Sequence, residues 1–120
     1  MVTLPDFKNV KGPVLMLNLL RFRDKTHYFE QYLPAFNKVA ASLGIKGIRV
    51  VLVSDVVANI LALPEDKWDA LAIVEYPDAN AFKTIAESEA YQNIAEPHRL
   101  AALEELKLLM TTPAALEVLS

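Results

Sequence analysis

An apolar run near the N-terminus, residues 14–22, predicts a strand that is covered on both faces. A strand with one face in water would alternate apolar with polar residues, but here both alternating sets are apolar. The exceptions are Asn18 in the middle of the run and Arg21 near its end. Because side chains alternate along a strand, these two residues point to opposite faces. We expect Asn18 to face a pocket and Arg21 to face a dimer interface or the interior of a barrel.

The next segment predicts a helix that begins at an N-cap, Thr26, and ends at Gly44. Apolar residues recur there at three- and four-residue spacing, which defines one helix face. They are Phe29, Tyr32, Leu33, Phe36, Val39, Ala40 and Leu43. Pro34 lies inside this pattern. Because proline removes a backbone hydrogen bond, we expect a kink or a late start of the helix.

Residues 48–63 and 68–76 predict two strands that pair as a hairpin. The first of these segments is rich in Val and Ile, which favours a strand, but it is longer than the usual five or six residues. Ser54 and Asp55 interrupt it, which indicates a bulge or a bend. Residues 64–67 form the expected turn.

The last third of the chain predicts a second helix and a fourth strand. Pro77 ends the hairpin, and Asp78 is the expected N-cap of the helix. Pro97 begins a further turn or short helix, because its missing N–H is harmless at a first helical position. Residues 106–112 then form the strand, and the apolar tail of residues 114–120 is expected to reach a partner subunit.

The order strand, helix, strand, strand, helix, strand predicts the α+β fold class. With right-handed crossovers, this βαββαβ order gives a ferredoxin-like fold with a four-stranded antiparallel sheet and both helices on one sheet face. The 120 residues fit one domain, residues 1–120. Because the strands are apolar on both sides, we expect a homodimer in which the sheets of two subunits cover each other and form an α+β barrel.

Composition narrows the range of functions. The chain is 53% hydrophobic, carries a net charge of -3 and has no basic run, so nucleic acid is not an expected partner. It lacks cysteine, which excludes thiol catalysis and cysteine-bound metals. No apolar stretch approaches the roughly 20 residues that cross a bilayer, and the N-terminus lacks the pattern of a secretory signal. We therefore expect a cytoplasmic protein without a membrane partner.

Known catalytic and cofactor motifs are not found in the sequence. With three glycines, the chain contains neither a phosphate-binding loop nor a dinucleotide fingerprint, and no serine has a histidine and an acid near it in sequence. His27 and Glu30 have a spacing that metal ligands use, but no third ligand is in register. We predict no metal and no cofactor.

Five residues are candidates for binding a small molecule, because each combines an apolar setting with a polar group. They are Asn18, Tyr32, Trp68, Tyr91 and Arg99. A buried amide costs roughly 1–3 kcal/mol if it is unpaired, so Asn18 requires a partner, either a protein group or a ligand. The aromatic residues could line a pocket or simply complete the core or an interface.

His98 and Arg99 are weak catalytic candidates, since a histidine after a helix break can act as an acid or a base near neutral pH. The alternative is a solvated helix start. Arg21 keeps its charge and must be paired or reach water. A ligand carboxylate is one partner, and an ion pair with a nearby acid is favoured over it. The acids considered are Glu75, Asp69 and Asp55.

Several short motifs, in this order and spacing, resemble the dimeric α+β barrel superfamily. Within it they resemble a domain family of unknown function whose first strand ends in an N-L-L-R-F motif, here residues 18–22. The further matches are Tyr28 and Tyr32, residues 68–82 (WDALAIVEYPDANAF), 88–91 (SEAY) and 99–103 (RLAAL), and Thr112 with Pro113. The resemblance covers almost the whole chain.

The resemblance implies a small apolar pocket between each sheet and its helices, as in the related antibiotic-biosynthesis monooxygenase and muconolactone-isomerase groups. It implies no reaction, because those relatives share a fold and differ in chemistry. Their second strands are often rich in glycine, whereas residues 49–61 here read RVVLVSDVVANIL, so the pocket floor is expected to be narrower or reshaped. Two functions remain open: a cofactor-independent enzyme that acts on a small apolar or aromatic substrate, and a non-catalytic binding or structural homodimer.

Overall fold

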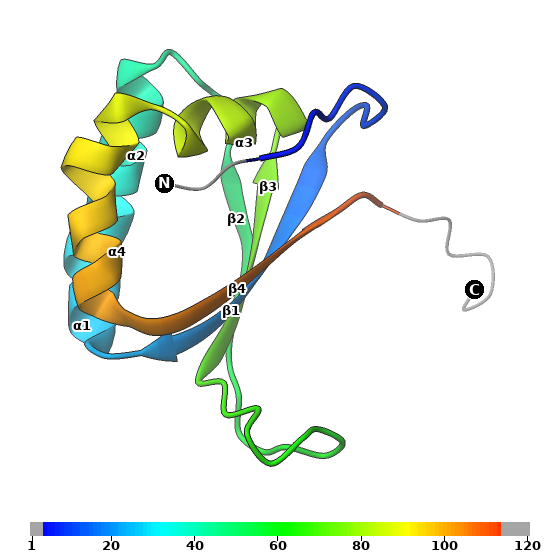
Figure 1. Ribbon diagram of the computed structural model, residues 1–120, viewed down its shortest axis with the longest axis vertical. Helices are drawn as coiled ribbons and strands as arrows, with labels where there is room; N and C mark the ends of the chain where they lie inside the picture. Colours follow the sequence, from blue (N-terminus) through cyan, green and yellow to red (C-terminus); the bar gives the residue numbers. More distant parts are fainter. Residues whose placement is uncertain (1–3, 114–120) are drawn as a thin grey trace.

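The computed structural model describes residues 4–113, which form a four-stranded sheet with a layer of helices on one face (Figure 1). The strands are β1 (Val14–Phe22), β2 (Arg49–Asp55), β3 (Ala70–Tyr76) and β4 (Leu103–Thr111). The helical segments are α1 (Lys25–His27), η1 (Tyr28–Tyr32), α2 (Leu33–Ser42), α3 (Ala79–Ala86), η2 (Tyr91–Ala95) and α4 (Glu96–Ala102). The strand order is β2-β3-β1-β4, and every neighbouring pair is antiparallel. This topology confirms the predicted α+β, ferredoxin-like fold.

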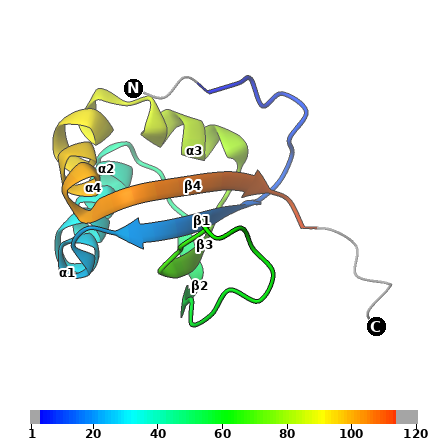
Figure 2. The ribbon, with the colours of Figure 1, turned by 60° about the horizontal axis from the view of Figure 1, so that its bottom comes forward.

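The core lies between the sheet and the helices. Val14, Met16 and Leu20 of β1 are buried on this face, and Val39 of α2 and Ile85 of α3 pack against them. Figure 2 shows β4 lying along β1, with α3 above β4 in this view. Alternation along β1 therefore turns Asn18 toward the helices and Arg21 away from them.

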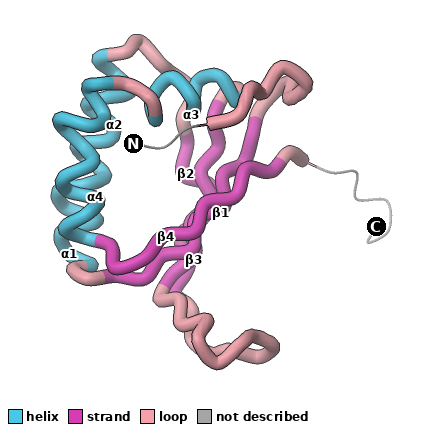
Figure 3. Tube along the Cα trace, viewed as in Figure 1, coloured by secondary structure: helices cyan, strands magenta, loops and turns pink. Residues whose placement is uncertain are grey.

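The opposite side of the sheet carries no helix (Figure 3). We call it the open face. It is defined by the apolar residues at odd-numbered positions of β1 and by the apolar residues that pair with them across the sheet, on β3, β4 and, beyond β3, on β2. They are Leu15, Leu17, Leu19, Leu52, Leu71, Ile73 and Leu109. None of these seven side chains is fully buried within the described chain, and Leu109 is 51% exposed. Apolar surface of this extent is typical of a protein interface.

Local details differ from the sequence prediction at the first helix and at the hairpin. Asp24, not Thr26, caps α1, because its carboxylate accepts a hydrogen bond from the backbone N–H of His27 at 3.0 Å. Strand β2 ends at Asp55, and residues 56–69 form a loop that extends away from the sheet (Figure 3). Within this loop the Asn59 amide donates to the carbonyl of Asp66, so the chain pairs with itself instead of continuing the strand.

The helix layer contains two π turns, η1 and η2, and one residue separates each of them from a proline. η1 ends with a hydrogen bond from the N–H of Leu33 to the carbonyl of Tyr28, and η2 ends with a bond from Glu96 to Tyr91. The next residue is a proline in both cases, and proline cannot donate the following bond. The wider turn accommodates this loss, so the helix continues past Pro34 without ending. Among residues 4–113, no helix is long and apolar enough to cross a membrane.

Candidate functional site

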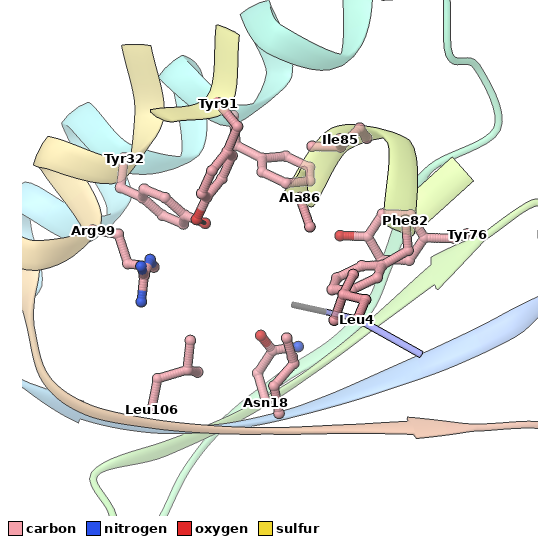
Figure 4. Close-up of a pocket in the computed structure, with 12 residues that line it drawn as sticks. Leu4, Asn18, Tyr32, Tyr76, Phe82, Ile85, Ala86, Tyr91, Arg99 and Leu106 are labelled. Carbon is pink, nitrogen blue, oxygen red and sulfur yellow. Dashed lines mark hydrogen bonds between the residues drawn. The ribbon is translucent and has the colours of Figure 1, made fainter. Parts of the chain in front are cut away.

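A cavity of about 130 Å³ lies between the sheet and the helices (Figure 4). Its wall is mainly apolar, with a few polar groups that come from five elements, β1, η1, β3, η2 and α4. The lining residues are Leu4, Asn18, Tyr32, Phe36, Tyr76, Phe82, Ile85, Ala86, Tyr91, Arg99, Leu106 and Leu108. A second cavity of about 110 Å³ shares Asn18, Tyr32, Phe36 and Tyr76 with the first, so the two lie on either side of the same residues.

Asn18 lies on the floor of the cavity at the centre of β1. Its side-chain NH₂ donates to the carbonyl of Met16 at 3.1 Å and to that of Ala72 on β3 at 3.4 Å. The small side chain of Ala72, in register with Asn18, leaves room for this geometry. Both donor hydrogens are thus directed at the backbone, and Oδ1 is the part of the amide that faces the cavity (Figure 4). Asn18 can therefore offer a ligand an acceptor.

Two tyrosines form the polar part of the helix wall. The hydroxyl groups of Tyr32, at the end of η1, and Tyr91, at the start of η2, lie 2.9 Å apart. Both π turns therefore supply a residue to the site, and π turns are frequent at functional sites. Two hydroxyls that share one hydrogen bond retain one hydrogen to donate elsewhere. The pair can therefore donate to a ligand oxygen.

Burial keeps the neighbouring phenols protonated. It raises the pKa of Tyr28 to about 12 and raises the pKa of Tyr32 and of Tyr76 well above the usual range. The nearby Tyr91 raises the pKa of all three further, because two adjacent phenolates would repel each other. At neutral pH these groups act as hydrogen-bond donors and not as tyrosinate bases.

These pKa values predict alkaline unfolding. An unfolded tyrosine loses its proton near pH 10, whereas folded Tyr28 keeps its proton up to about pH 12. Between these pH values the unfolded state binds fewer protons than the folded state. The free energy of unfolding therefore falls as pH rises above 10, by about 1.4 kcal/mol per pH unit for each such tyrosine. Tyrosinate absorbance should therefore rise together with the loss of circular dichroism. Absorbance that rises fully near pH 10 while the chain stays folded would contradict this expectation.

Arg99, on α4, extends its guanidinium into the cavity below the tyrosine pair (Figure 4). Its side chain is 22% exposed, and its nearest carboxylate is Glu96 of the same helix, with 3.5 Å between Nη2 and Oε1. Its Nε is buried and has no hydrogen-bond partner among the described residues. The cavity therefore contains a positive charge that is only partly compensated.

The other predicted site residues lie elsewhere. The ring of Trp68 stacks between Arg21, at 5.3 Å, and Lys107, at 5.5 Å, and does not line either cavity. His98 is hydrogen bonded through Nδ1 to Nε2 of His27 at 2.9 Å, between α4 and α1, and its ring is also outside both cavities. The structure thus brings together four of the five predicted binding residues, all except Trp68. Among residues 4–113 no cluster of three or more potential metal ligands occurs.

Arg21 has a different partner from those expected. Its Nη1 lies 2.8 Å from Oε2 of Glu105, and its Nε donates to the carbonyl of Lys67 at 2.7 Å. The favoured pairing with one of three other acids was therefore wrong; those acids were Glu75, Asp69 and Asp55. The reason is that β4 begins at Leu103, earlier than the predicted start at residue 106, so Glu105 is a strand residue in register with Arg21.

Several wall residues were not singled out from the sequence as pocket residues. They are the apolar residues Phe36, Phe82, Ile85, Leu106 and Leu108, and Tyr76, whose hydroxyl points into the cavity (Figure 4). Phe36, Phe82 and Ile85 belong to the apolar faces of their helices, and that pattern alone does not separate cavity walls from filled core.

Comparison with solved structures supports the fold assignment. The chain is similar to a protein of unknown function from Rhodopseudomonas palustris, with 27% identity, 89% of this chain and 87% of that chain covered, and a TM-score of 0.72. It is also similar to SnoaB, a cofactor-independent oxygenase from Streptomyces nogalater, with 16% identity, coverage of 90% and 99%, and a TM-score of 0.55.

A third similar structure is a dimeric ferredoxin-like protein of unknown function from Thermobifida fusca. It is 15% identical, with 85% of this chain and 92% of that chain covered and a TM-score of 0.52. No family model and no curated protein matches the chain. The topology and these neighbours define the chain as an α+β protein of the ferredoxin-like fold.

Proposed function

We propose that the chain is a small-molecule-binding protein whose cavity takes an apolar or aromatic molecule with a polar group. The observation that carries this proposal is the composition of the cavity wall, which is apolar except for a few groups that converge on one space. Those groups are the Asn18 amide oxygen, the Tyr32–Tyr91 hydroxyl pair, the Tyr76 hydroxyl and the Arg99 guanidinium. Ligand sites combine an apolar lining with sparse polar groups in this way.

The size of the cavity suits a single ring. A closed apolar cavity of about 150 Å³ accepts benzene. The present cavity, at about 130 Å³, is bordered by a second one of about 110 Å³. A substituted ring can therefore lie against Phe36 and Phe82 and place its substituents toward the polar groups.

The proposal includes a homodimer formed through the open face. Seven apolar residues on that side of the sheet are only partly covered, or exposed, within the described chain, and a second copy offers the complementary surface. A fold neighbour from Thermobifida fusca is described as dimeric, which supports this assembly. The predicted tail, residues 114–120, lies outside the described residues.

Two forms of this function have separate support. A cofactor-independent enzyme is supported by the shared fold of SnoaB, which is such an oxygenase. A non-catalytic binding or structural dimer is supported by hydrogen bonds within the site, because the Asn18 NH₂ is bonded to the backbone and the two tyrosine hydroxyls are bonded to each other. No proton-transfer role is assigned to His98, whose Nδ1 is bonded to His27.

Calorimetric titration with p-cresol, an aromatic ring with one hydroxyl, tests the proposed site. We expect one p-cresol per chain. Ala86→Leu should weaken binding at least tenfold, because Ala86 lines the cavity and the added carbons would fill it. Ala101→Leu, at an exposed position of α4, is the matched control and should bind like the wild type. Absence of binding, or equal binding by both variants, would contradict the proposed site.

A further inference from the structure

Arg99 is the charged residue that lines the cavity, and its hydrogen bonding is incomplete. A guanidinium has five N–H donors and keeps its charge at every pH relevant to a folded protein. The Arg99 Nε is buried and has no partner among the described residues. A half-buried charge with a buried, unpaired N–H is less stable than one with full hydrogen bonding, so this position favours an added anion.

The one nearby carboxylate does not supply the missing partner. Glu96 lies 3.5 Å from Nη2, whereas a strong charge-assisted hydrogen bond measures about 2.7–2.9 Å. The two side chains are 22% and 24% exposed, so the pair lies at the margin of the cavity. No aspartate or glutamate is among the residues that line the cavity. The cavity thus presents one cation and no lining anion.

The other polar groups distinguish two ends of the site. The tyrosine pair, next to Arg99, has one hydroxyl hydrogen to donate, so both groups at this end favour a negatively charged oxygen. Asn18 lies on the sheet floor opposite and presents an acceptor oxygen (Figure 4). That end favours a donor such as a hydroxyl group, with the apolar wall between the two ends.

We propose that the cavity binds small apolar or aromatic carboxylic acids as their anions, with the carboxylate on Arg99. The planar guanidinium matches a carboxylate with two parallel hydrogen bonds, which a neutral amide cannot accept in the same way. The ring lies against the apolar wall, and a hydroxyl at the far end donates to Asn18 Oδ1. This inference rests on the proposed function, because it names the ligand class of the same cavity.

The test compares 4-hydroxybenzoate with 4-hydroxybenzamide in calorimetric titrations of the full chain at neutral pH. The two probes have nearly the same shape, and only the first is charged. We expect 4-hydroxybenzoate to bind at least tenfold more tightly, because hydrogen bonds to charged groups are about twice as strong as neutral ones. Equal binding of the two probes, or tighter binding of the amide, would overturn the inference.

Variants of Arg99 test whether this residue causes the preference for 4-hydroxybenzoate over 4-hydroxybenzamide. Arg99→Met keeps the apolar stem and should abolish the preference, whereas Arg99→Lys keeps the charge without the planar fork and should retain part of it. Arg23→Met is the matched control, since Arg23 is 56% exposed and pairs with Glu104 outside the cavity. A preference that survives Arg99→Met overturns the inference. If Arg99→Met does not fold, Arg99→Lys replaces it: a preference for 4-hydroxybenzoate that is unchanged in Arg99→Lys would also overturn the inference.

Binding of p-cresol separates the two proposals. If p-cresol binds and the carboxylate has no advantage over the amide, the anion inference fails while the proposed function stands. If none of the three probes binds, both fail.

Discussion

Leu109→Glu is expected to convert the proposed dimer into a single chain of 13.4 kDa in sedimentation at micromolar concentration. Leu109 lies on the edge strand β4, in register with Leu17 on the open face. An unpaired carboxylate buried between two sheets costs about 3 kcal/mol or more, which corresponds to more than a 100-fold weaker association. The fold of the separate chain should persist, because Leu109 is 51% exposed there. The wild type should sediment at about twice the single-chain mass.

Leu100→Glu is the matched control for this experiment. Leu100 is 56% exposed, close to the value for Leu109, but it lies on α4 and away from the open face. The same charge at this position should leave the dimer intact. A wild type of 13.4 kDa, or equal loss of mass in both variants, would rule out the open face as the dimer interface.

Two substitutions of Asn18 are expected to change stability in opposite directions. The side-chain NH₂ of Asn18 donates to the carbonyl groups of Met16 and Ala72, and Asn18→Asp puts an oxygen in its place. This oxygen faces the same two carbonyl oxygens and has no hydrogen to donate. We expect a loss of about 2 kcal/mol, because a half-buried charge is left without a hydrogen-bond donor. Asn18→Leu removes the polar group and should raise stability by about 1 kcal/mol through added apolar burial.

Denaturant midpoints and p-cresol titrations of both variants provide the measurements. If the cavity binds a ligand through the Asn18 oxygen, Asn18→Leu should be more stable than the wild type and bind p-cresol at least tenfold more weakly. A loss of stability in Asn18→Leu, together with no detectable ligand for the wild type, would instead favour the structural dimer. The comparison therefore separates the two forms of the proposed function.

The fold could be predicted because its main signals are local. The alternation of residues 14–22 separates Asn18 from Arg21, and one proline and one aspartate mark the start of α3. The same alternation predicts the open face, since both sides of β1 are apolar. Strand pairing then follows from the βαββαβ order, which allows few arrangements.

The site was only partly predictable, because it depends on contacts between distant segments. Tyr32 and Tyr91 were recognised as separate candidates, but their hydroxyl contact joins two π turns that are 59 residues apart. The sequence does not show which way the side chain of Trp68 points, because Trp68 lies two residues before β3, which begins at Ala70. In the structure its ring contacts Arg21 and does not line the cavity. The incomplete bonding of Arg99 is a property of the packed helices and has no counterpart in the local sequence.

Proton NOEs between p-cresol and the protein locate the bound ring, so they show whether it occupies the cavity. We expect contacts from the ring to Tyr91, Phe82 and Asn18, which line the cavity on the helix side of the sheet. Contacts confined to Leu17 and Leu109, on the open face, would contradict this expectation.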